Sequence, residues 1–109
     1  MTQHMPIADK DKILNKHLTE IIGLYRYKKF NIAEKKSRDL IKKYPKSITV
    51  RKILGNVLSA QENYNESIKC FEEILKNNPK DPDSLNNLGS IYVKKLDLKK
   101  AINYYKKAI

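Results

Sequence analysis

The sequence repeats itself at an interval of 34 residues, and this interval limits the fold more than any other feature. When the chain is shifted by 34 positions, Pro45 falls on Pro79, and Gly55 falls on Gly89 with a leucine before each glycine. Other sets of equivalent positions hold residues of one kind. One set is small (Ala33, Ser67 and Ala101), one is large and apolar (Phe30, Tyr64 and Leu98), and one near the end of the period is apolar (Ile41, Leu75 and Ile109). Matches of this kind indicate stacked copies of one structural unit.

Each period predicts two helices. Apolar residues recur at helical spacing in both halves of the middle period, first at Val50, Leu54, Val57 and Leu58 and then at Ile68, Phe71, Ile74 and Leu75. The whole chain holds only 3 glycines and 4 prolines, so few positions can interrupt a helix. Nothing in the composition favours a sheet, and the predicted fold class is all-α.

The predicted helix boundaries coincide with capping residues. Ser47, Asp81 and Asp97 are good N-caps, and Pro82 suits the first turn of a helix because its missing N–H has no partner there. Asn63, followed three residues later by a glutamate, has the pattern of a capping box. The two repeated glycines lack a side chain and predict a close approach between neighbouring helices.

The interval divides the chain into a short tail and one domain. Residues 1–8 are expected to be a disordered tail, and residues 9–109 a single domain with repeats at about 14–47, 48–81 and 82–109. The first repeat is degenerate, with Glu20-Ile21 in place of Leu-Gly, and the last one ends at its second helix. In that final helix the residues expected to face inward are Ala101, Tyr105 and Ala108.

This pattern resembles the tetratricopeptide repeat family over about residues 14–109. The resemblance is carried by two successive sets of residues: Leu54-Gly55, Leu58, Tyr64, Ser67, Phe71 and Pro79, and then Leu88-Gly89, Tyr92, Leu98, Ala101, Tyr105 and Ala108. The resemblance implies a right-handed α-solenoid of antiparallel helix pairs, in which the first helix of each pair lines a concave groove. It also implies a protein–protein interaction scaffold that binds a peptide or helix of a partner in that groove.

Placed on this chain, the groove would be lined by residues of the three first helices: Leu18, Ile22, Tyr25, Arg26, Lys52, Asn56, Ser59, Asn86, Asn87, Ser90 and Lys94. Some relatives bind a terminal carboxylate through a clamp of Lys and Asn side chains. Lys52, Asn56 and Asn87 are similar to part of that clamp, whose last two basic residues would belong to a further repeat. The alternative is that these side chains form a solvated groove without a clamp.

The formal net charge is +11, weighted to +7 over residues 14–47 and +4 over residues 82–109. Such charge attracts nucleic acids or acidic partners. Lysines and one arginine cluster between Lys28 and Lys46, but only Phe30 and Tyr44 supply aromatic rings there, and bases need such rings for stacking. A nucleic-acid-binding module is therefore the less favoured interpretation. The more favoured interpretation is that these lysines only solvate the exposed faces of the helices.

Nothing in the sequence builds a catalytic or metal site. Cys70 is the only cysteine, and neither histidine lies in a nucleophile or ligand pattern, so we expect no enzyme activity, metal or cofactor. His17 is read as a packing residue and Cys70 as a half-buried apolar one. Without a signal peptide or a membrane span in the pattern, the predicted location is the cytoplasm.

The last helix stops at Ile109 without a polar capping helix. A terminal repeat normally has a polar outer face, so this face predicts either a longer protein or self-association through the exposed C-terminal helix. The alternative function is the N-terminal arm of a larger bacterial enzyme, of the glycosyltransferase or sulfotransferase type, that recruits a substrate or partner.

Overall fold

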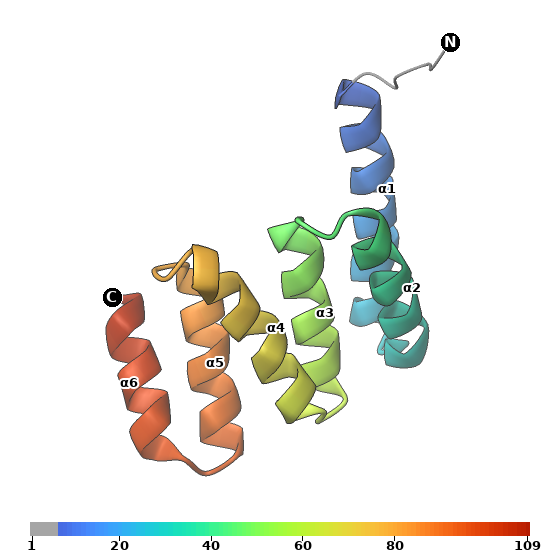
Figure 1. Ribbon diagram of the computed structural model, residues 1–109. Coiled ribbons are helices and arrows are strands. Elements are labelled where there is room, and N and C mark those ends of the chain that lie inside the picture. Colours follow the sequence, from blue (N-terminus) through green and yellow to red (C-terminus); the bar gives the residue numbers. More distant parts are fainter. Residues whose placement is uncertain (1–6) are drawn as a thin grey trace.

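The computed structural model describes residues 7–109, which form six helices and no strand (Figure 1). The predicted all-α fold class is confirmed. Successive helices pair antiparallel, and the body measures 56 × 29 × 19 Å. The helices are α1 (Ile7–Arg26), α2 (Phe30–Lys43), α3 (Ile48–Ala60), α4 (Tyr64–Asn77), α5 (Pro82–Lys94) and α6 (Leu98–Ala108).

Packing joins each helix to the next along the chain, and joins first helices to one another, α1 to α3 and α3 to α5. The molecule is therefore a solenoid with two successive cores rather than one central core. The first core is shared by α1, α2 and α3 and contains Leu18, Ile21, Ala33, Leu40, Val50 and Val57. The second is shared by α4, α5 and α6 and contains Ile68, Phe71, Ile74, Leu88, Ile91, Tyr92 and Ala101.

Three of the four predicted N-caps form. Ser47 accepts a hydrogen bond from the Val50 amide at 3.2 Å, Asp81 from the Ser84 amide at 3.0 Å, and Asp97 from the Lys100 amide at 3.2 Å. The predicted capping box at Asn63 is wrong, because its side-chain amide donates to the Glu66 carboxylate at 3.2 Å instead of capping the helix. A direct contact between the two side chains takes the place of two side chain–backbone bonds.

The turn inside each helix pair has the same backbone conformation. Lys28, Glu62 and Leu96 all have positive φ, at 60°, 63° and 62°, and they are spaced 34 residues apart. Left-handed backbone normally favours glycine. No glycine marks these turns in the sequence. Each turn is closed by a backbone hydrogen bond in which an amide donates to the carbonyl five residues earlier: Lys29 to Leu24 at 2.9 Å, Asn63 to Leu58 at 2.9 Å and Asp97 to Tyr92 at 2.8 Å.

Gly55 and Gly89 permit the predicted close contacts. A Cβ atom at Gly55 would lie 2.7 Å from the Phe71 ring, and one at Gly89 would lie 2.7 Å from the Tyr105 ring. Each ring therefore lies directly against the backbone of the preceding helix. Tyr105 faces α5 as predicted but stays 38% exposed. A neighbour not singled out from the sequence, Tyr104, stacks on Tyr92 with ring centroids 5.7 Å apart.

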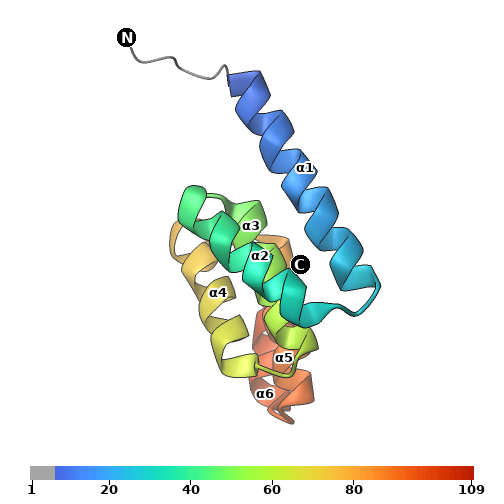
Figure 2. The ribbon, with the colours of Figure 1, turned by 90° about the vertical axis from the view of Figure 1, so that its right-hand side faces the viewer.

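The chain's first helix differs from the rest in length. With 20 residues it is the longest of the six, and its N-terminal half projects beyond α2 (Figure 2). Residues 1–6 of the expected tail lie outside the described residues, and residues 7 and 8 are already helical. Within residues 7–109 no helix combines the length and apolar character that crossing a lipid bilayer requires.

Candidate functional site

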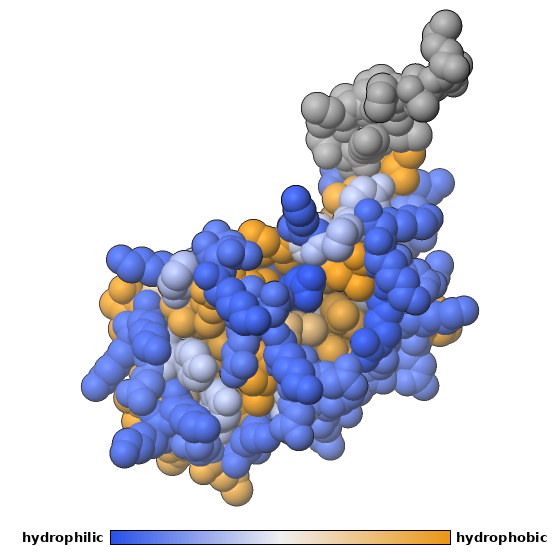
Figure 3. All heavy atoms as spheres, viewed as in Figure 1, coloured by the Kyte–Doolittle hydropathy of each residue, from blue (hydrophilic) through white to orange (hydrophobic). Residues whose placement is uncertain are grey.

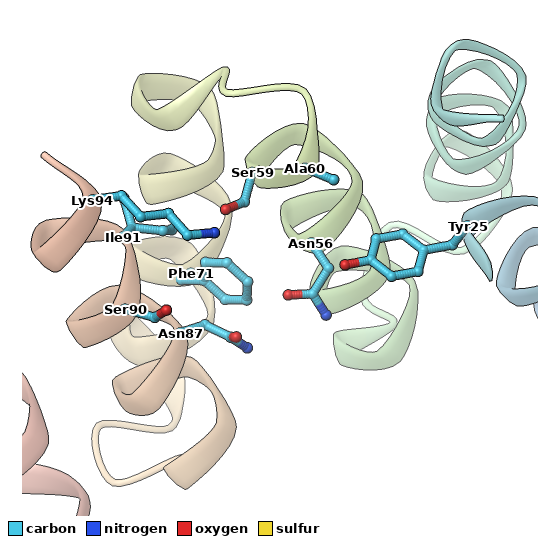
Figure 4. A pocket seen from close by; sticks show the side chains of 9 residues that line it. All are labelled: Tyr25, Asn56, Ser59, Ala60, Phe71, Asn87, Ser90, Ile91 and Lys94. Carbon is cyan, nitrogen blue, oxygen red and sulfur yellow. The ribbon is translucent and has the colours of Figure 1, made fainter. Parts of the chain in front are cut away.

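A cavity of about 120 Å³ opens between α3 and α5, and α1 reaches its edge (Figure 4). Consecutive first helices pack together, so their facing side chains meet at this point. Four polar residues lie on facing surfaces because they are three residues apart on their helices, Asn56 and Ser59 on α3 and Asn87 and Ser90 on α5. The lining residues are Tyr25, Asn56, Ser59, Ala60, Phe71, Asn87, Ser90, Ile91 and Lys94.

The polar ends of these side chains converge. In Figure 4 the amides of Asn56 and Asn87 approach each other from opposite helices, and the Lys94 side chain extends toward the Ser59 hydroxyl. The side-chain hydrogen bonds found among the described residues use none of these groups. Amide, hydroxyl and ammonium donors thus face one small space and can all donate to one anionic group.

Tyr25 connects this cavity with a second one of about 130 Å³ between α1 and α3. The second cavity is lined by Ile22, Tyr25, Ile53 and Asn56 and is mainly apolar. The Tyr25 ring is held edge-on by Phe30, with centroids 5.5 Å apart. Figure 3 shows that hydrophobic atoms also reach the surface between α3 and the first helix pair. A polar subsite and an apolar subsite therefore adjoin.

Most of the predicted groove residues come together around these two cavities: Ile22, Tyr25, Asn56, Ser59, Asn87, Ser90 and Lys94. Arg26 and Asn86 are exposed and line neither cavity, and Leu18 is buried in the first core. Ile53 was missed, although it lies one turn before Asn56 on the same face of α3. Its spacing was visible in the sequence, but it reads there as an ordinary core position.

Lys52 is held by a neighbouring repeat instead of lining a cavity. Its ammonium lies 3.0 Å from Asp81 Oδ1 and 3.0 Å from Asp83 Oδ2, at the start of α5. Burial alone would lower the pKa of Lys52, yet its bonds to these two carboxylates raise it. The lysine expected to begin a carboxylate clamp thus already binds two carboxylates of its own chain, and Lys94 is the cation that lines the cavity.

The hydrogen bonds that Asp81 accepts also favour its charged form. Burial alone would raise the pKa of Asp81, but hydrogen bonds from Ser84 and Lys52 outweigh it and hold the pKa below its ordinary value. The helix N-terminus adds to this preference for a negative charge. Asp81 therefore caps α5 and joins it to α3 at once.

The basic cluster of the first repeat is partly neutralised by nearby carboxylates. Arg38 donates to Glu34 at 2.8 Å and to Glu66 at 2.7 Å, which links α2 to α4. Lys36 lies 3.9 Å from Glu20. Arg38 thus acts in the packing of two repeats, although the sequence pattern reads as a continuous basic run.

The two residues considered for chemistry have structural surroundings. His17 is half-buried and its Nδ1 lies 3.9 Å from Glu20 Oε2. Cys70 is half-buried beside Gly55, and burial raises the pKa of its thiol. A raised pKa disfavours the reactive thiolate, which agrees with the reading of Cys70 as an apolar packing residue.

Comparison with known proteins supports the repeat pattern. The family model for the tetratricopeptide repeat matches residues 46–109. The Hsp70-Hsp90 organizing protein 1 of Glycine max is 35% identical over 86 residues, which are 76% of this chain. The Hsp70-Hsp90 organizing protein of Triticum aestivum is 34% identical over 82 residues, or 72% of the chain. The chain spans about 15% and 14% of the lengths of these relatives.

Proposed function

Because the chain belongs to the tetratricopeptide repeat family, we propose that it is a protein-interaction module that binds a peptide segment of a partner in the groove formed by α1, α3 and α5. Both relatives are named as proteins that organise two other proteins, Hsp70 and Hsp90. This supports protein partners for the present chain and a role in binding without catalytic turnover.

The chemistry of the two cavities supports a peptide that carries a carboxylate next to an apolar side chain. Asn56, Asn87 and Lys94 offer donors to the carboxylate, and hydrogen bonds of this charged kind contribute about 1.5–3 kcal/mol each. Ile22 and Ile53 offer apolar surface to the neighbouring side chain. Each cavity is smaller than the roughly 300–1,000 Å³ of a site for a whole small molecule, so each suits one group of a longer ligand.

The observation that carries this proposal is the convergence of donors from α3 and α5 on one cavity beside an apolar one. A displayed library of octapeptides with free C-termini supplies the probes, and selected peptides are measured by fluorescence anisotropy. We expect Asn87→Ala and Lys94→Ala to weaken binding by about tenfold or more, since each removes a donor to a charged group. Lys80→Ala, an exposed lysine outside the groove, is the matched control.

The source of the carboxylate is tested by amidating the C-terminus of each selected peptide. If amidation abolishes binding, the C-terminal carboxylate is the group that binds. If binding survives amidation but is abolished by an internal Asp→Asn change in the peptide, the group is a side-chain carboxylate. The proposal is rejected if selected peptides bind Asn87→Ala and Lys94→Ala as well as the original chain. Cytoplasmic location and the arm of a larger enzyme remain predictions from the sequence.

A further inference from the structure

An ion pair lies directly beside the polar cavity of the groove. Lys52 precedes Asn56 by one helical turn on α3, and Asp83 precedes Asn87 by one turn on α5. Four residues of an α-helix rise by about 6 Å, which separates the level of the pair from the level of the two amides. Lys52 Nζ and Asp83 Oδ2 are 3.0 Å apart. A carboxylate of the chain itself is therefore bound next to the space proposed for a ligand carboxylate.

The two carboxylates bound to Lys52 are held in different ways. Asp81 also accepts hydrogen bonds from the Ser84 amide at 3.0 Å and from the Ser84 hydroxyl at 2.6 Å, and these bonds fix it as the N-cap of α5. The side chain of Asp83 is 69% exposed. Among the side-chain hydrogen bonds found within residues 7–109, its carboxylate takes part only in the bond to Lys52. Asp83 is thus the carboxylate that can leave Lys52 without disturbing the helix cap.

Stacking of the first helices does not depend on this pair. At the preceding junction, between α1 and α3, Leu18 is equivalent to Lys52 and Thr49 is equivalent to Asp83. Leu18 belongs to the first core and Thr49 is exposed, so the same place in that junction holds no ion pair. The pair between α3 and α5 is therefore an addition to the repeat rather than part of its packing.

The charges along the groove are distributed unevenly. Lys52 is matched by two carboxylates, which leaves an excess of one negative charge at its end of the groove. Lys94 lines the polar cavity and takes part in none of the ion pairs found within the described part of the chain. The groove thus offers one unmatched cation to a ligand carboxylate. A second ligand carboxylate, placed near Lys52, would meet an occupied lysine and the negative charge of Asp83.

Building on the proposed binding of a ligand carboxylate in the polar cavity, we propose that Asp83 is a specificity-determining residue of the groove. It occupies Lys52 in place of a ligand carboxylate and so disfavours peptides that carry a second acidic residue close to the first. In an extended peptide, residues two positions apart point to the same side and are separated by about 6.6 Å. This spacing matches the rise of about 6 Å between Asp83 and Asn87. The disfavoured acidic residue is therefore two positions from the residue whose carboxylate enters the cavity.

The test compares octapeptides that differ at this one position. Each octapeptide selected on the original chain is made with Asp and with Asn two positions from the residue whose carboxylate binds, and affinities are measured by fluorescence anisotropy. On the original chain we expect the Asn version to bind about threefold more tightly, because Asp83 repels the Asp version. On Asp83→Asn the order should reverse by a similar factor, because Lys52 then has an ammonium N–H available for the second carboxylate.

Two further variants assign the effect to the ion pair. Asp39→Asn makes the same change of charge at an exposed site on α2, outside the groove, and should leave the order of the two peptides as it is on the original chain. Adding Lys52→Met to Asp83→Asn should abolish the gain of the Asp version, because its cation is then missing. Circular dichroism checks that each variant is folded, and the ratio of two affinities on one variant does not depend on its stability.

Two outcomes overturn the inference. The first is that Asp83→Asn leaves the ratio of the two affinities unchanged. The second is that the gain of the Asp version persists when Lys52→Met is added, because Lys52 would then not be the group that Asp83 occupies. Failure of the proposed function has a different signature, since the selected peptides would then bind Asn87→Ala and Lys94→Ala as well as the original chain, and both proposals would fall.

Discussion

The first helix pair and the two later pairs fill equivalent positions in opposite ways. In the later pairs a glycine of the first helix lies against an aromatic ring of the second, Gly55 against Phe71 and Gly89 against Tyr105. In the first pair the equivalent residues are Ile21 and Ser37, and both are buried. The bulky side chain has moved to the first helix and the small one to the second. The space between the two helices of a pair is therefore filled in every repeat, although the residue that fills it differs.

The junctions between repeats differ as well. Between α3 and α5 the ammonium of Lys52 binds Asp81 and Asp83, whereas the position equivalent to Lys52 in α1 is Leu18, part of the first core. One junction is therefore partly ionic and the other apolar at the same place in the fold. The two should respond differently to changes of core volume, backbone and pH, which the following experiments measure.

The largest difference is expected for the aromatic rings. Phe71→Ala should lower the free energy of unfolding by about 3–5 kcal/mol, because the ring is fully buried and leaves a cavity. Tyr105→Ala should lower it by about 1–2 kcal/mol, because its ring is 38% exposed. Urea denaturation followed by circular dichroism measures both. Equal losses would show that the third pair packs as firmly as the second.

The effect of Gly→Ala substitutions on the free energy of unfolding should differ in sign along the chain. Gly55→Ala should destabilise by about 1–2 kcal/mol, because the new methyl group meets the immobile Phe71 ring. Gly89→Ala should be less harmful, since the exposed Tyr105 ring can move aside. Gly23→Ala meets no atom within 4 Å and should stabilise by about 0.5–1 kcal/mol. Melting temperatures of the three variants give the order, and any other order would contradict the assigned contacts.

The ionic junction should weaken in acid. The folded-state pKa of Asp81 is lowered, so its contribution is complete above its unfolded pKa and is lost as pH falls through the folded value. Asp81→Asn keeps an N-cap but removes the charge, and should cost about 0.5–1 kcal/mol at pH 7. The difference from the original chain should shrink as pH falls through the lowered folded-state pKa of Asp81 and vanish below it, because both side chains are then neutral. Stability curves from pH 7 to pH 2 test this, and a constant difference would exclude an ionic origin.

A similarly small effect is expected at a buried hydroxyl group. Ser67 Oγ donates to the Gly55 carbonyl at 2.7 Å, and the equivalent residue in the third pair is Ala101. Ser67→Ala should cost about 0.5–1.5 kcal/mol, the usual contribution of one hydrogen bond. The same urea titration measures it, with Ala101→Ser as the reverse substitution. A stabilised Ser67→Ala would show that the second pair does not need this bond.

The repeat interval was enough to predict the helices, the three N-caps and the glycine contacts, because these features depend on residues close in sequence. The spacing also predicted that Asn56, Asn87 and Lys94 face a groove, and they line one cavity, whereas binding of a partner there stays a prediction. The role of Lys52 could not be predicted, because its carboxylate partners belong to the next repeat. The left-handed turns at Lys28, Glu62 and Leu96 could not be predicted either, because none of these three residues is a glycine.

Neighbour-to-neighbour packing also gives the molecule a particular mechanical character. A force applied between the two ends of this 56 Å body passes from one repeat to the next, because within residues 7–109 no contact joins α1 directly to α5 or α6. Each junction between repeats bears the same load, so the weaker junction opens first and the other remains closed. Under tension the chain should lengthen in steps, as a compliant spring does, instead of rupturing at once.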